Sequence, residues 1–302
     1  MNFIDKIIDK LHLTFEWTGN NKKIIKQSGE GIKVNNEQSG VTNIFQIENL
    51  TVTAIQELAG YSLDQTTPDF MNSAGRRFLL EQKARQENLS ATVTEASLSA
   101  IEAPQSVEPG WFLRWMDISQ TVSKQDIRTI LAKILSGEVT NSNSFSLSTL
   151  DVVKNLSKNE LELFQIFCNI SFSIPVTGDS LTCVICEPFG NPGDNGLKDL
   201  GLSYTNLTTL QDAGLIKSDL NSWRQFSIPV MLQLPFTLGS SQHALSSTGE
   251  TTEVVHQVKI LNFTTVGIEL RSVMQIGFNE TYNEKFFDWV NGRWHMVKTE
   301  NK

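Results

Sequence analysis

The chain is poor in cysteine, proline and charged residues. Of its 302 residues, 3 are Cys, 8 are Pro and 19% are charged, whereas charged residues make up about a quarter of an average protein. Three cysteines are too few, and odd in number, for the disulfide framework of a small secreted protein. Hydrophobic residues account for 39%, with 17 Phe and 6 Trp, which excludes a disordered or collagen-like chain and provides for a large core.

Long apolar runs are also missing. The longest uncharged stretches, residues 163–178 and 225–249, are interrupted by polar residues in the first and by Pro and Gly in the second. Neither offers the roughly 20 apolar residues that a membrane-spanning helix needs. The first 17 residues lack both an apolar core and a small-residue cleavage site, so they do not form a signal peptide. We therefore expect a cytoplasmic, bacterial protein without an integral membrane segment.

Sequence signatures of catalysis are absent as well. None of the 4 histidines adjoins a nucleophile, and the chain has no G-x-S-x-G, H-E-x-x-H or P-loop motif. Cys183 and Cys186 form a C-x-x-C, but no second tight pair supplies the four ligands of a structural zinc site. Two small buried thiols are the simpler interpretation. We expect no catalytic residue, no metal and no cofactor, and we favour a protein that is not an enzyme.

The N-terminal 70 residues divide into two kinds of segment. Residues 2–12 have the apolar spacing of an amphipathic helix, and their charge-neutral polar face favours docking on protein over binding to a membrane surface. Residues 30–53 contain short β-like pieces between glycines. Strands this short are marginal on their own, so we predict that they pair between copies in a homo-oligomer. A flexible linker is the alternative.

Residues 71–172 have a helical pattern and are predicted to form a helical domain. Apolar residues recur at helical spacing over 72–102, 111–118, 124–139, 147–155 and 157–167. The clearest stripe carries Ile130, Leu131 and Ile134, which we expect in the core. Residues 123–126 resemble a capping box, and residues 157–160 match one. These closely spaced helices predict a compact bundle.

Residues 173–302 are richer in β-branched residues, Ser, Thr and Gly, with strands expected over 171–188 and 224–238. A helix containing Leu210 ends at Gly214, and a later strand leads to a helix that Thr264 or Thr265 can cap, with Gly267 inside it. This order is typical of a winged-helix unit, although an ordinary α+β domain can have the same glycine and threonine residues at its helix ends. The predicted fold class is α+β, with domains 1–70, 71–172 and 173–302.

Nucleic-acid binding is the second function to consider. The formal net charge is −8, which argues against a general nucleic-acid coat. The helix expected over 204–213 has no Arg or Lys with which to read bases, so sequence-specific DNA recognition is not expected. Non-specific binding would use the basic residues of the 22–85 region, which are Lys22, Lys23, Lys26, Lys33, Arg76, Arg77, Lys83 and Arg85.

Several stretches of the middle region carry a family resemblance. They are residues 85–89, Trp111 with the aromatic helix that follows it, residues 122–126, residues 131–139, which read L-A-K-I-L-S-G-E-V, and residues 144–150, which read S-F-S-L-S-T-L. They resemble an uncharacterised bacterial domain family with the pattern W-A-K-I-L-A-G-E-V followed by G-S-F-S-L-R-T-L and then L-x-x-L-Q-x-A-G-L-I, the last of which is similar to residues 207–216. The chain departs from that pattern at Leu131, Asn143 and Ser148. More distantly, it is similar to the abortive-infection (Abi-alpha-like) helical domains of phage-defence loci.

The resemblance covers residues 75–270 and implies a non-enzymatic interaction or regulatory protein of a bacterial anti-phage defence or mobile-element locus, with a protein partner encoded nearby. An unrecognised hydrolase or toxin is a further alternative. Within the motif, Gly137 permits close packing, Phe145 lies in the second stretch, and Glu138 stands near a helix end, where the dipole disfavours a carboxylate. We therefore expect Glu138 to have a partner, either Lys133 or a backbone N–H near Ser146, and we interpret the motif as specifying the fold.

Overall fold

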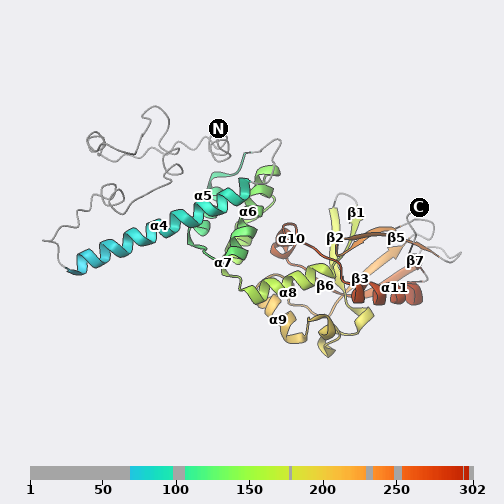
Figure 1. Cartoon of the computed structure of the whole chain (residues 1–302). Coiled ribbons are helices and arrows are strands. Elements are labelled where there is room, and N and C mark those ends of the chain that lie inside the picture. Colours follow the sequence, from blue (N-terminus) through green and yellow to red (C-terminus); the bar gives the residue numbers. More distant parts are fainter. Residues whose placement is uncertain are drawn as a thin grey trace. The chain divides into compact units, whose positions relative to one another are not determined.

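The computed structural model of the protein describes residues 69–97, 106–176, 179–228, 234–247, 254–294 and 296–298 (Figure 1). The chain divides into two compact units, Met1–Leu150 and Asp151–Lys302. The predictions for residues 2–12 and 30–53, and those for the four lysines between 22 and 33, lie outside the described residues. The three-domain division with boundaries at 70/71 and 172/173 stays a prediction.

The first unit is built from α4 (Asp69–Ser97), α5 (Pro109–Thr121) and α6 (Gln125–Thr140), and α7 (Leu147–Asn155) runs across the junction between the two units. The long helix α4 packs against both α5 and α6. The stripe expected from the sequence is buried, with Ile130 7% exposed and both Leu131 and Ile134 fully covered. Trp115 is also fully buried, and its indole N–H donates to the Leu131 carbonyl at 2.9 Å.

The helix starts follow the capping rules only in part. The capping box predicted at Ser157 and Glu160 is confirmed, because Ser157 Oγ accepts from the Glu160 N–H and the Glu160 carboxylate accepts from the Ser157 N–H. The box predicted at 123–126 is wrong. Helix α6 starts one residue later than that box requires, with Lys124 at the N-cap and no side chain capping it. Ser123 is therefore one position too early to accept from the first helical turn.

The second unit is a seven-stranded antiparallel sheet with helices packed on it (Figure 1). The strand order is β3-β6-β2-β1-β4-β5-β7. The strands are β1 (Phe172–Val176), β2 (Asp179–Ile185), β3 (Ser222–Ile228), β4 (Leu234–Leu238), β5 (Ser241–Ser247), β6 (Val254–Asn262) and β7 (Met296–Lys298). The helices are α8 (Lys158–Asn169), α9 (Tyr204–Asp212), α10 (Thr265–Arg271) and α11 (Glu280–Trp294), with short 3-10 turns at Glu187–Phe189, Pro192–Asp194 and Lys198–Leu200.

Aromatic side chains join the helices of the second unit to the sheet. On α11, the Phe286 ring lies 5.8 Å from Phe172 of β1 and 5.9 Å from Phe236 of β4. Tyr282 of the same helix is fully buried, and its hydroxyl donates to the Ile185 carbonyl at the end of β2 at 2.6 Å. On α8, Phe167 packs edge-on against Phe263 at 4.8 Å. These contacts form the core of the second unit.

The structure confirms the predicted α+β class, with helices mainly in the N-terminal part. It also shows the predicted helix-ending glycine and helix-capping threonine. Gly214 follows α9 with a φ of +74°, and Thr264 caps α10 by accepting from the Gly267 N–H at 3.0 Å. The winged-helix arrangement itself is not confirmed, since the strands join one antiparallel sheet of seven.

Candidate functional site

The predicted site residues that the structure describes lie in three places. Arg76, Arg77, Lys83 and Arg85 are on α4. The motif residues with Glu138 at their centre lie on α6 and in the turn that follows it. Leu210, Gly214 and Gly267 belong to the second unit, at α9 and α10. The sequence grouped the α4 cations with lysines that lie outside the described ranges, so the basic cluster is described only in its α4 part.

Glu138 holds the turn between α6 and α7. Glu138 is 1% exposed, and its two carboxylate oxygens accept from different backbone amides. Oε1 accepts from the Asn143 N–H at 2.7 Å, and Oε2 accepts from the Phe145 N–H at 3.0 Å. Asn143 sits in the left-handed region, with a φ of +66°. A backbone N–H near Ser146 was one of the two expected partners, and the Phe145 N–H is adjacent to that residue.

Gly137 and Phe145 meet beside this carboxylate. A Cβ at Gly137 would lie 2.7 Å from Cε2 of the Phe145 ring, so only glycine lets the ring approach the helix this closely. The Phe145 carbonyl accepts from the Trp111 indole N–H of α5 at 2.7 Å. The motif therefore ties α5, α6 and the following turn together, and its polar groups bond within the fold.

The glycines and Leu210 of the second unit serve close packing. Leu210 is fully buried on α9. A Cβ at Gly267 would lie 2.0 Å from the Leu215 carbonyl oxygen, which is closer than any side chain tolerates. The Thr264 hydroxyl donates to the Gly214 carbonyl at 2.6 Å and so joins the start of α10 to the end of α9. These residues fix the backbone of this region.

The cysteines of the second unit are buried thiols. Burial raises the pKa of Cys183 and of Cys186 to about 12, and it raises the pKa of Cys168 as well. Cys186 Sγ donates to the Lys259 carbonyl at 3.3 Å. Thiolates are the nucleophilic and metal-binding form of cysteine, and burial suppresses them here at neutral pH. Within the ranges that the structure describes, no three His, Cys, Asp or Glu side chains lie together as a metal site would require.

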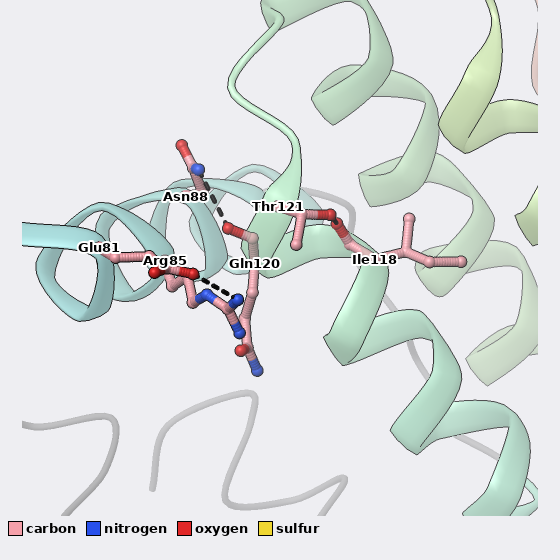
Figure 2. A network of polar contacts seen from close by, with 6 residues as sticks. All are labelled: Glu81, Arg85, Asn88, Ile118, Gln120 and Thr121. Carbon is pink, nitrogen blue, oxygen red and sulfur yellow. Dashed lines mark hydrogen bonds and ion pairs between the residues drawn. The ribbon is translucent and has the colours of Figure 1, made fainter. Parts of the chain in front are cut away.

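The second half of helix α4 is hydrogen-bonded to α5, and the first half has one face that is exposed. From Asn88 onwards it is attached to its neighbours, since Asn88 Nδ2 donates to the Gln120 carbonyl at the end of α5 at 3.1 Å (Figure 2). Nearby, the Thr121 hydroxyl donates to the Ile118 carbonyl at 2.8 Å and closes the last turn of α5. Figure 1 shows the first half of α4 extending past the ends of α5 and α6.

That first half exposes large apolar side chains among charged ones. Leu80 is 64% exposed and Phe78 is 46% exposed, whereas Leu79 is only 3% exposed. At 100° per residue, Arg76, Leu80, Lys83, Ala84 and Glu87 share one face of the helix, and all five are exposed. We call these five residues the α4 face. Leu80 is the most exposed of the large apolar side chains among the described residues.

Carboxylates on the same helix neutralise half of the α4 cations. Arg85 Nη2 lies 2.6 Å from Glu81 Oε1 (Figure 2), and Lys83 Nζ lies 3.6 Å from Glu87 Oε1. Arg76 and Arg77 form no ion pair with any residue that the structure describes. The whole helix carries four basic residues and four acidic ones, so its formal charge is zero. A phosphate backbone would therefore meet two available cations here, rather than the four counted from the sequence.

Leu80 was not among the residues expected from the sequence to form a site. It belongs to a Leu-Leu pair in which Leu79 has the helical spacing of the core. Two consecutive residues cannot face the same side of a helix, so one of such a pair must point away from the core. The pair itself is therefore the signal in the sequence that could have identified an exposed leucine on this helix.

Comparisons with known proteins give one match. A family model described as a protein of unknown function, DUF2806, matches residues 72–287. No curated protein matches the chain, and no solved structure matches it. The matched range includes most of α4, the Glu138 turn, strands β1 to β6 and the first half of α11. Among the described helices, none is long and apolar enough to cross a membrane.

Proposed function

The chain belongs to the DUF2806 family of unknown function, and from this premise we propose that it is a non-enzymatic interaction protein that binds through the α4 face. The observation that carries the proposal is Leu80, which is 64% exposed between the charged residues of this face. Interfaces characteristically place an apolar centre inside a polar rim. Leu80 supplies the centre here, and Arg76, Lys83 and Glu87 supply the rim.

The electrostatics of the face define the kind of partner that fits. Lys83 is already paired with Glu87, whereas Arg76 has no carboxylate among the described residues. A complementary surface therefore needs an apolar patch opposite Leu80 and a carboxylate opposite Arg76. A protein surface supplies both, whereas a phosphate backbone supplies only the negative charge.

The biological setting is proposed from the sequence resemblance alone. The distant resemblance of the sequence to abortive-infection helical domains is the reason for proposing a regulatory protein of the bacterial cytoplasm, encoded in an anti-phage defence or mobile-element locus. In that setting the product of a neighbouring gene would be a further partner. A test of this setting is phage challenge of cells carrying the whole locus, with and without an intact copy of this gene.

The experiment that tests the interaction is co-purification. The full-length tagged protein is expressed together with an untagged copy of itself and with its adjacent genes, and the products retained by the wild type are compared with those retained by Leu80→Glu. We expect Leu80→Glu to lose the retained product. The control is Leu147→Glu, because Leu147 of α7 is 50% exposed and receives the same change outside the α4 face. Equal retention by the wild type and Leu80→Glu would contradict the proposal.

Non-specific nucleic-acid binding is a second candidate, and Arg76 and Arg77 favour it because neither forms an ion pair with a residue that the structure describes. Each cation that stops binding phosphate reduces the slope of log affinity against log salt concentration by about one. If Arg76 and Arg77 bind phosphate, the double variant Arg76→Gln/Arg77→Gln reduces that slope by about two in a titration with duplex DNA. An unchanged slope would remove this candidate.

A further inference from the structure

The charges of the α4 face are complementary to those of a second α4 face when the two helices run antiparallel. Arg76 lies four residues before Leu80, and Glu87 lies four residues after Lys83. In an antiparallel pair of helices, placing Leu80 opposite Lys83 of a second copy therefore places Arg76 opposite Glu87 of that copy. Two-fold symmetry repeats both contacts, as a closed dimer interface requires.

We propose that the α4 face binds a second copy of this chain, through antiparallel pairing of the two α4 helices about Leu80 and Lys83. The inference rests on the proposed function, because it names the partner of the same surface. Each Leu80 would be covered by the aliphatic part of Lys83 from the other copy, since lysine buries its methylene stem while its ammonium stays in water. Each Glu87 would lie between Lys83 of its own helix and Arg76 of the other.

Charge and exposure both favour this occupant. Lys83 Nζ is 3.6 Å from Glu87 Oε1 within one helix, so this carboxylate is already positioned on the face where the second Arg76 would arrive. The side chains of Lys83 and Glu87 are 53% and 66% exposed, so both remain accessible to a partner. A parallel pairing would instead set Arg76 against Arg76, and like charges in contact are unfavourable.

The same pairing explains why a formally neutral helix can have a charged binding surface. Arg76 and Arg77, which form no ion pair within the described ranges, lie toward the start of α4, and Glu87 lies past its middle. An antiparallel partner helix is complementary to this separation of charge, because its Glu87 then lies opposite Arg76 and its Arg76 lies opposite Glu87. Nucleic acid carries one sign of charge and gains nothing from Glu87.

The test is a charge exchange in the full-length protein, followed by sedimentation equilibrium over a range of concentrations. One chain has a mass of 33.8 kDa, and we expect twice that mass for the wild type at high concentration. Arg76→Glu and Glu87→Arg should each weaken dimerisation about tenfold or more, since each sets like charges opposite one another. The double variant Arg76→Glu/Glu87→Arg restores opposite charges and should recover dimerisation to within about threefold of the wild type.

Arg224→Glu is the matched control, because Arg224 is an exposed arginine of β3 in the other unit. Recovery in the double variant also shows that the single variants lose the interface and not the fold. If each change unfolded the protein, combining them would not restore the mass of the dimer. A wild type of single-chain mass at every concentration would overturn the inference. So would a dimer that both single variants retain, or single variants that dissociate without recovery in the double variant.

The outcomes for the two proposals are distinguishable. If the protein is monomeric and Leu80→Glu still loses a co-purified product, the α4 face binds another protein and only the second-copy inference fails. If the protein is monomeric and Arg76→Glu abolishes a shift of duplex DNA in a gel, the face binds phosphate. That result would overturn both.

Discussion

Replacing Glu138 tests the turn that joins α6 to α7. Glu138 is 1% exposed, and its carboxylate accepts two backbone N–H groups, one from Asn143 and one from Phe145. Glu138→Gln keeps the shape of the side chain and removes the charge. The amide oxygen can still accept from one N–H, but the amide nitrogen then faces the other donor, which is left without an acceptor.

The expected magnitude follows from these two bonds. A hydrogen bond to a charged group contributes about 1.5–3 kcal/mol, and a buried donor left without a partner costs about 1–3 kcal/mol. Glu138→Gln should therefore lower the free energy of unfolding of the first unit by about 2–4 kcal/mol. Glu138→Ala loses both bonds and leaves a cavity, so we expect a loss of about 3–5 kcal/mol. Domains are stable by only about 5–15 kcal/mol, so either change is large.

The assay is urea unfolding monitored by hydrogen exchange with mass spectrometry. Peptides from α5 and α6 then report the unfolding of the first unit separately from that of the second. The control is Glu162→Gln on α8, where the side chain is 64% exposed and its ion pair with Lys158 is solvated. That change should cost less than about 1 kcal/mol. If Glu138→Gln unfolds at the wild-type urea concentration, the two hydrogen bonds do not hold the turn, and the structural role assigned to the motif is wrong.

Three further predictions concern the cores and the buried thiols. Leu131→Ala should lower the free energy of unfolding by about 2–5 kcal/mol, because the side chain is fully buried, and a wild-type melting curve would contradict the assigned core. Gly267→Ala should destabilise the second unit, since its Cβ would lie 2.0 Å from the Leu215 carbonyl oxygen; an unchanged urea midpoint would refute that close approach. The three thiols have a raised folded pKa, so their stabilisation is complete below the unfolded pKa near 9 and is lost as the pH rises toward 12. From pH 8 to 10 the free energy of unfolding should fall by about 1.4 kcal/mol per thiol. In Cys183→Ala the fall over this pH range should be smaller by the contribution of one thiol. If the variant and the wild type lose the same free energy, burial does not raise the pKa of Cys183.

Much of the fold could be predicted because its signals are local. The spacing of Ile130, Leu131 and Ile134 identified a core helix, and the Ser157 box identified a helix start. The cap predicted at Ser123 failed because a capping motif identifies residues that can cap a helix but does not fix the residue at which the helix begins. The order of the strands depends on contacts between residues far apart in the chain, which periodicity does not encode.

The candidate site was less predictable than the fold. Counting charges grouped Arg76, Arg77, Lys83 and Arg85 as one basic cluster, but the last two are paired with carboxylates one helical turn away. The i,i+4 spacing of those pairs was readable from the sequence. The exposure of Leu80 needed the helix to be placed against its neighbours, since an apolar residue beside a core position is not by itself a surface feature.

Hydrogen exchange of α4 tests the central claim most directly. The full-length protein is measured in dilute solution and again in the concentrated or co-purified state, and peptides that cover residues 74–87 are compared with peptides that cover α9. If the α4 face is the binding surface, exchange over residues 74–87 slows in the associated state while exchange over α9 stays the same. Unchanged exchange over residues 74–87, with slowing elsewhere in the chain, would contradict the account.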